Sequence, residues 1–179
     1  SADRSHQEAA LDLLEGLIGS GDQSFERRNG EILRELLLPP RVVDTAPGRG
    51  SYPRVQIRAA RLAGRADTPA TSETLLRLLD AETDPALLAT AVRQLAEMTY
   101  IEPTNLAGRF GELLMQENVG SRKDSRLAAA LIDGALLLYR KWGAESSLLI
   151  RGVLDARTLN YSRETRQRAW RFVEAVLEG

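Results

Sequence analysis

Cysteine is absent from this 179-residue sequence, and histidine occurs once, at position 6. Without thiols the fold cannot depend on disulfides or thiolate metal sites, and cysteine nucleophiles and thiol redox chemistry are excluded. His6 lies near a terminus, so general-base catalysis by a positioned imidazole is not expected. The phosphate-loop, nucleophile-elbow, zinc-protease and dinucleotide-binding motifs are missing as well. The sequence therefore predicts a protein that is not an enzyme and that needs no metal and no cofactor.

Long hydrophobic runs are also missing, because no apolar stretch reaches the roughly 18 residues that a membrane span needs. The sequence starts at Ser1 without methionine, which indicates a processed or trimmed start, and no signal peptide is recognisable in it. The localisation stays open between cytoplasm and periplasm. The oligomeric state is undetermined at this stage.

The apolar residues that are present favour helices. Leucine (29) and alanine (23) far outnumber valine and isoleucine, which together contribute 14 residues. Leucine and alanine are strong helix formers, whereas the β-branched residues favour strands. With 43% hydrophobic and 27% charged residues, the composition is that of a globular chain with a real core. An all-α fold is the first expectation.

Apolar residues at helical spacing predict about nine helices, over residues 5–18, 25–38, 54–65, 72–81, 85–98, 105–117, 124–142, 145–156 and 163–177. Residues 1–38 are expected to form an N-terminal helical hairpin, and residues 54–179 a single continuous domain of helical repeats. Between them, residues 39–53 hold four of the seven prolines and are predicted to form a loop. Whether this loop is a plain linker or a partner-contacting element is open.

Capping residues support these helix boundaries. Asp84 stands before Pro85 at a predicted helix start, where the missing proline N–H has no cost. Ser5 and Glu8 have the spacing of a capping box at the first helix. Further caps are expected at Thr104, Asp124 and Ser162, with Gly143 as a left-handed terminator.

Alternate helices repeat from residue 53 onward. Residues 53–64 superimpose on residues 85–96, which places Val55 over Leu87 and Ala59 over Ala91. These ranges contain the Ile-Arg-Ala-Ala segment at 57–60 and the Ala-Val-Arg-Gln-Leu segment at 91–95. The equivalent positions are Val55, Leu87, Leu127 and Thr165. Their spacings are 32, 40 and 38 residues, and each interval holds a second helix.

These segments, the Asp84-Pro85 start and the length of the helical pair resemble the HEAT-repeat family of armadillo-like helical solenoids. The resemblance covers residues 53–179, with a long first helix in the third unit and no second helix in the fourth. It implies a right-handed α-α superhelix of stacked antiparallel helix pairs, with first helices on the convex side and second helices on the concave side. Stacked pairs would share one elongated core.

One predicted helix carries an isolated charge. Residues 128–139 are apolar nearly all round, which indicates a helix buried on several sides, and Asp133 is their only charged residue. Either burial raises the pKa of this carboxyl for a binding role, or the carboxylate pairs with an arginine at a solvent-facing gap.

The net charge of −1 hides an asymmetry. Residues 1–118 have a net charge of −5, residues 119–171 a net charge of +6, and residues 172–179 a net charge of −2. Candidate residues of a basic C-terminal end are Arg122, Lys123, Arg126, Arg163 and Arg166. Such a surface could bind protein, bind nucleic acid, or be a solvated face without a partner.

The favoured hypothesis is a non-catalytic scaffold that binds a partner protein or peptide on its concave face or basic end. Helical phase places its candidate contacts outward on the second helices, at Glu73, Arg77, Arg109, Glu112, Gln116 and Arg151. The alternative hypothesis is a nucleic-acid-binding helical repeat that uses the C-terminal arginine-rich surface.

Overall fold

The computed structural model describes residues 2–18, 26–38, 53–121 and 123–178. All regular secondary structure in these ranges is helical. The helices are α1 (Ala2–Ile18), α2 (Glu26–Leu37), α3 (Pro53–Ala66), α4 (Pro69–Ala81), α5 (Pro85–Glu97), α6 (Pro103–Val119), α7 (Ser125–Trp142), α8 (Ser147–Thr158) and α9 (Arg163–Glu178). The predicted all-α fold is confirmed, with every helix end within three residues of its expected position. Of the predicted loop over residues 39–53, residues 39–52 lie outside the described part, and Pro53 begins α3.

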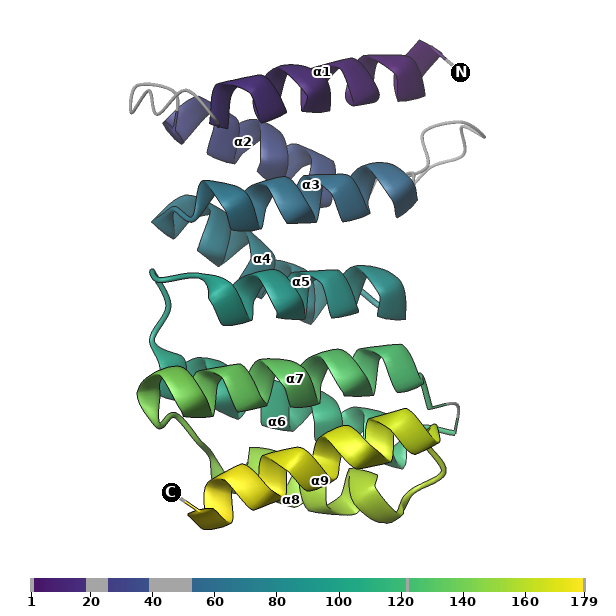
Figure 1. Ribbon diagram of the computed structural model, residues 1–179. Coiled ribbons are helices and arrows are strands. Elements are labelled where there is room, and N and C mark those ends of the chain that lie inside the picture. Colours follow the sequence, from purple (N-terminus) through teal and green to yellow (C-terminus); the bar gives the residue numbers. More distant parts are fainter. Residues whose placement is uncertain (1, 19–25, 39–52, 122, 179) are drawn as a thin grey trace.

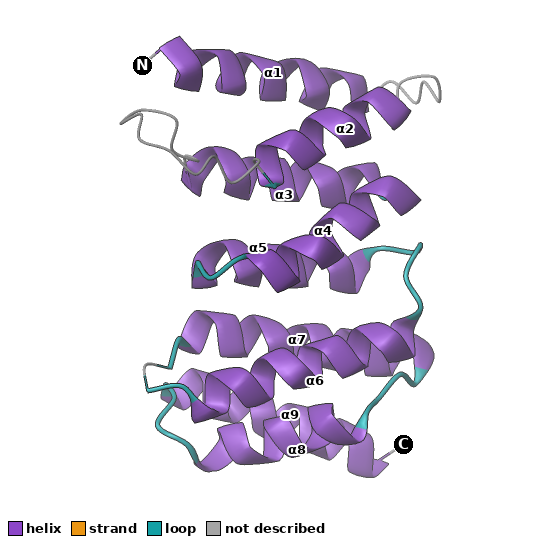
Figure 2. Ribbon diagram, turned by 180° about the vertical axis from the view of Figure 1, so that it is seen from behind, coloured by secondary structure: helices purple, strands orange, loops and turns teal. Residues whose placement is uncertain are grey.

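The helices form a two-layer stack. The odd-numbered helices α1, α3, α5, α7 and α9 lie roughly side by side in one layer, which we call the odd layer (Figure 1). The even-numbered helices form the second layer, the even layer, seen in front when the molecule is viewed from behind (Figure 2). The described ends of the chain lie at opposite ends of the stack (Figure 1). This arrangement confirms the predicted stacking of helix pairs.

Packing within the even layer is uneven. In the odd layer each helix packs against the next, and in the even layer α2 packs against α4 and α6 against α8. Among successive described helices of the same layer, α4 and α6 are the pair without close backbone packing, and an ion pair of Asp80 with Arg109 connects them instead. Each even helix also packs more closely against the odd helix that follows it than against the one that precedes it.

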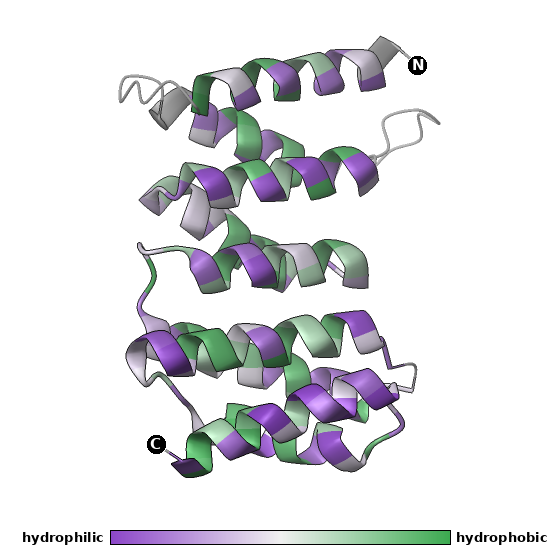
Figure 3. Cartoon of the chain, in the orientation of Figure 1, coloured by the Kyte–Doolittle hydropathy of each residue, from purple (hydrophilic) through white to green (hydrophobic). Residues whose placement is uncertain are grey.

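One hydrophobic core runs through the stack, from Leu11 in α1 to Phe172 in α9. The four positions that sequence superposition made equivalent, Val55, Leu87, Leu127 and Thr165, are each at most 4% exposed. Hydrophilic residues recur on the outward side of the odd-layer helices (Figure 3). Each helix therefore buries one face against its neighbours, as in a helical array whose units share a core. None of the described helices is long and apolar enough to cross a membrane.

Several predicted caps are confirmed. Asp84 accepts hydrogen bonds from the backbone N–H groups of Ala86 (2.8 Å) and Leu87 (3.0 Å), with Pro85 as the first helical residue. Asp124 caps α7 in the same way, and the Ser162 hydroxyl accepts from an N–H group in the first turn of α9. Gly143 ends α7 with a φ of 63°, in the left-handed region where glycine is favoured.

Three other predictions of helix starts are wrong. Helix α1 begins at Ala2, so Ser5 lies inside the helix and cannot form a capping box with Glu8. Helix α6 is capped by Glu102, with Pro103 as its first residue, so Thr104 is not the cap. Helix α4 starts three residues earlier than expected because Thr68 and Thr71 form a capping box before it.

Candidate functional site

The predicted contact residues lie on the outward side of the even layer. We call this surface the even face and define it by Glu31, Arg34, Glu73, Arg77, Arg109, Glu112, Gln116 and Arg151. Helices α2, α4, α6 and α8 supply these side chains. All are exposed except Arg109, which is half-buried. The six residues chosen from helical phase are therefore on the surface, as predicted.

Most charges of the even face are paired with one another. On α4, Glu73 accepts from Arg77 at 2.5 Å, one turn away. On α6, Arg109 pairs with Glu112 at 2.9 Å and also with Asp80 of α4. Exposed ion pairs of this kind contribute about 0–1 kcal/mol each to stability. They present side chains of both charge signs across α4 and α6.

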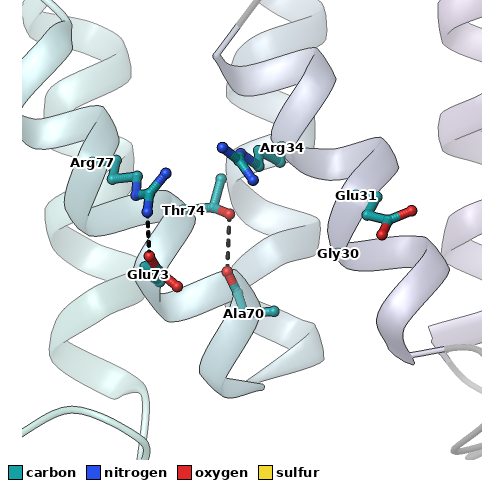
Figure 4. A pocket seen from close by; sticks show the side chains of 7 residues that line it. All are labelled: Gly30, Glu31, Arg34, Ala70, Glu73, Thr74 and Arg77. Carbon is teal, nitrogen blue, oxygen red and sulfur yellow. Dashed lines mark hydrogen bonds and ion pairs between the residues drawn. The ribbon is translucent and has the colours of Figure 1, made fainter.

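A small cavity opens on the even face between α2 and α4 (Figure 4). Its volume is about 180 Å³, and it is lined by Gly30, Glu31, Arg34, Ala70, Glu73, Thr74 and Arg77. The two helices approach closely here, since a Cβ atom at Gly30 would lie 3.3 Å from the Cβ of Ala70. The Thr74 hydroxyl donates to the Ala70 carbonyl at 2.9 Å. The polar lining of the cavity is therefore supplied mainly by charged side chains.

Arg34 is the guanidinium available to a ligand in this cavity. Arg77 is already paired with Glu73, whereas Arg34 is exposed and has no ion-pair partner in the described part of the chain. Small-molecule sites usually have volumes of roughly 300–1,000 Å³. At about 180 Å³ the cavity suits a single side chain of a partner rather than a substrate.

The predicted basic end is assembled at the beginnings of α7 and α9. The backbone N–H of Ser162 donates to the Ser125 hydroxyl at 3.0 Å, and the Thr165 hydroxyl donates to the Ser125 carbonyl at 3.1 Å. These bonds hold the two helix starts together. Of the predicted basic residues, Lys123, Arg126, Arg163 and Arg166 lie at this end, and Arg122 lies outside the described residues.

Three of these four cations are engaged within the molecule. The Lys123 ammonium donates to the carbonyls of Asn118 (2.8 Å) and Gly120 (3.0 Å) at the end of α6. Arg126 pairs with Asp124 at 3.1 Å, and Arg166 donates to the Tyr161 carbonyl at 2.6 Å. Arg163 alone among them is exposed without a partner in the described ranges. Three of the four described cations of the basic end therefore make contacts at helix ends, and Arg163 has no such contact in the described ranges.

Asp133 lies in a second cavity, on the outward side of the odd layer. This cavity of about 320 Å³ lies between α5, α7 and α9, and its lining includes Arg93, Asp133, Glu164 and Arg168. Arg168 pairs with Asp133 and, at 2.6 Å, with Glu164. Burial raises the pKa of the Asp133 carboxyl, and the nearby arginines, Arg168 first, act in the opposite direction. Three arginines, Arg93, Arg126 and Arg168, and two carboxylates, Asp133 and Glu164, line this cavity. The contact with Arg168 matches the interpretation of Asp133 as the partner of an arginine.

The contact residues predicted from the sequence did not include Arg34 and Glu31, because the prediction considered only the helices after residue 53. The available signal was helical phase, since positions 31 and 34 point away from the buried stripe of Asn29, Leu33 and Leu37. No phase argument could have shown that α2 and α4 enclose a cavity, because that depends on how two helices cross.

Within the described ranges, no group of three or more histidine, cysteine, aspartate or glutamate side chains lies close enough to hold a metal ion. No protein-family model, curated protein or solved structure shows a significant match to the chain. Any functional assignment therefore depends on the surface geometry described above.

Proposed function

We propose that this chain is a non-catalytic, HEAT-like scaffold that binds a partner protein or peptide on its even face. The observation that carries the proposal is the cavity between α2 and α4, which has the volume of one side chain and a free guanidinium, Arg34, at its edge. An acidic side chain of the partner would fit this cavity and pair with Arg34. In the HEAT-like arrangement the even layer would be the concave side.

The paired charges on α4 and α6 extend the proposed surface beyond the cavity. The Glu73–Arg77 and Arg109–Glu112 pairs present both signs of charge in a fixed order. Such a pattern favours a partner with complementary alternating charges and disfavours partners of a single charge sign. Gln116 and Arg151 continue the surface on α6 and α8.

Protein binding is favoured over the alternative, nucleic-acid binding at the basic end. Binding to a phosphate backbone needs several cations that are free to replace counterions. At the basic end Lys123, Arg126 and Arg166 are used in helix caps and internal hydrogen bonds. The basic end is therefore proposed to have a mainly structural role.

The test compares capture by variants of the tagged chain from a nuclease-treated lysate of its native organism. Arg34→Glu places a carboxylate where the partner's acidic side chain would bind, and should lower capture at least tenfold. The double variant Arg109→Glu, Arg151→Glu should also lower capture, because it changes the charge order on α6 and α8. Arg61→Glu is the matched control, since Arg61 is exposed on α3 in the odd layer.

Equal capture by Arg34→Glu and Arg61→Glu would overturn the even face as the binding surface. Capture that occurs only from a parallel lysate without nuclease, and that decreases steeply with salt, would favour nucleic-acid binding instead. Circular dichroism of each variant shows whether the helices remain folded, so that loss of capture is not confused with unfolding.

A further inference from the structure

The cavity that contains Asp133 lies in the odd layer, away from the even face, and we call it the odd-layer cavity. It is bounded by α5, α7 and α9, with α7 between the other two helices (Figure 1). Its volume of about 320 Å³ falls at the lower end of the range of small-molecule sites, roughly 300–1,000 Å³. The cavity therefore has room for a small polar molecule between three helices.

Arg93 is the guanidinium of the odd-layer cavity that is available to a ligand. Arg126 pairs with Asp124 at 3.1 Å, and Arg168 pairs with both carboxylates that line the cavity. Arg93 is exposed and has neither an ion pair nor a side-chain hydrogen bond with the residues that the structure describes. A guanidinium binds a carboxylate through two parallel hydrogen bonds. Arg93 therefore favours a ligand that carries a carboxylate group.

The two lining carboxylates can each accept a further hydrogen bond. Arg168 binds Oδ2 of Asp133 and, at 2.6 Å, Oε1 of Glu164. Oδ1 of Asp133 and Oε2 of Glu164 are not used in these pairs, and an ionised carboxylate has about four acceptor positions. The same two carboxylates repel a ligand with a second negative charge, such as a phosphate dianion. The ligand therefore needs a hydrogen-bond donor beside its single carboxylate.

The free guanidinium lies close to these carboxylates. Burial raises the pKa of the Asp133 carboxyl, whereas the positive charges of Arg168, Arg93 and Arg171 lower it, in that order. Arg93 acts on Asp133 from α5, and Arg171 acts from α9 without lining the cavity. One small ligand can thus place its carboxylate at Arg93 and its donor at Asp133 or Glu164.

We propose that the odd-layer cavity binds a small carboxylic acid with a hydroxyl or ammonium group on the carbon next to the carboxylate. The carboxylate binds the Arg93 guanidinium, and the hydroxyl or ammonium group donates to Asp133 or Glu164. This proposal does not depend on the even face, which lies on the other layer.

Three probes with the same carbon skeleton test the proposal. L-lactate, L-alanine and propionate carry a hydroxyl group, an ammonium group and a hydrogen atom, respectively, beside the carboxylate. A ¹H–¹⁵N NMR titration of the full chain, at constant pH and ionic strength, gives a dissociation constant for each probe. We expect lactate or alanine to bind about tenfold more tightly than propionate, because only these two can donate to a lining carboxylate. The tighter of the two identifies the donor.

A substitution at Arg93 tests the carboxylate contact. Arg93→Gln should weaken binding of the tighter probe about tenfold, because it removes the guanidinium. Arg61→Gln is the matched control, since Arg61 stands 32 residues earlier at the equivalent position of the preceding repeat, is exposed and does not line the cavity. The NMR spectrum of each variant also shows whether it is folded.

Four results would each overturn the proposal. They are the absence of saturable binding by all three probes, binding of propionate as tight as that of lactate and alanine, tighter binding of inorganic phosphate than of either acid, and equal affinity of Arg93→Gln and Arg61→Gln for the tighter probe.

Discussion

Gly111 of α6 lies directly against the backbone of Leu149 in α8. A Cβ atom at Gly111 would come 2.5 Å from the Leu149 amide nitrogen and 2.9 Å from its Cα. Both neighbouring atoms belong to backbone, so neither can rotate away as a flexible side chain could. The absence of a side chain at position 111 therefore sets how closely α6 and α8 pack.

Gly111→Ala should destabilise the fold because the added methyl group must push two helices apart. Overpacking of this kind typically costs about 1–3 kcal/mol. Urea unfolding followed by circular dichroism measures the change in the free energy of unfolding.

Gly108→Ala provides the matched control on the same helix. A Cβ atom at Gly108 meets nothing within 4 Å. This substitution should stabilise the protein by about 0.5–1 kcal/mol, because alanine loses less backbone entropy in a helix than glycine. If both alanine variants change the free energy of unfolding by the same amount and in the same direction, the result contradicts the close packing of α6 against α8 at Gly111.

A buried hydrogen-bond chain links α6, α8 and the connection between α8 and α9 near the C-terminal end of the stack. The Tyr161 hydroxyl donates to the Asn118 side-chain oxygen at 2.8 Å, and the Asn118 amide donates to the Gly152 carbonyl at 2.8 Å. Tyr161→Phe removes the donor and leaves a buried oxygen without a partner, which should cost about 1–3 kcal/mol. Thermal or urea unfolding measures the cost.

Tyr100→Phe serves as its control, because Tyr100 is 60% exposed and its hydroxyl can be replaced by water contacts. The control should leave the free energy of unfolding nearly unchanged. A Tyr161→Phe variant as stable as the wild type would contradict the buried chain from Tyr161 through Asn118 to Gly152.

Asp124 should make stability depend on pH in the acid range. Hydrogen bonding to the Arg126 side chain, followed by the backbone N–H groups of Leu127 and Arg126, lowers the pKa of this carboxyl below its ordinary value of 3.8. A carboxyl whose pKa is lower in the folded state contributes stability above the unfolded pKa and loses it as pH falls through the folded pKa. The contribution of Asp124 is therefore complete at neutral pH and decreases below pH 3.8.

Asp124→Asn retains an oxygen that can cap α7 but removes the titrating charge. At pH 7 the variant should be less stable by about 0.5–1 kcal/mol. The difference from the wild type should shrink as the pH is lowered below 3.8, in unfolding curves measured at a series of pH values. A difference that stays constant with pH would show that the charge of Asp124 does not contribute.

Helix positions could be predicted because they depend on local patterns. Asp84 and Pro85 mark the start of α5 through bonds within one turn, and Val55 and Leu87 are buried as their equivalent spacing predicts. The predicted capping box at Ser5 failed because α1 extends to Ala2, ahead of the residues that carry the capping pattern.

The surfaces were less predictable because they depend on how helices cross. Helical phase placed Arg109 outward correctly, but its ion pair with Asp80 joins two helices whose relative position no local pattern contains. For the same reason the cavity beside Arg34 could not be anticipated, since it exists only where α2 crosses α4 at Gly30 and Ala70.

The central claim is that a partner protein binds the even face, and site-specific photo-crosslinking tests it most directly. A photoreactive residue replaces Glu31, which is exposed beside the cavity, or Arg61, which is exposed on α3 in the odd layer. After irradiation in cells of the native organism, position 31 should give a discrete protein adduct that resists nuclease, and position 61 should give none. Adducts from position 61 alone, or adducts that nuclease removes, would contradict the claim.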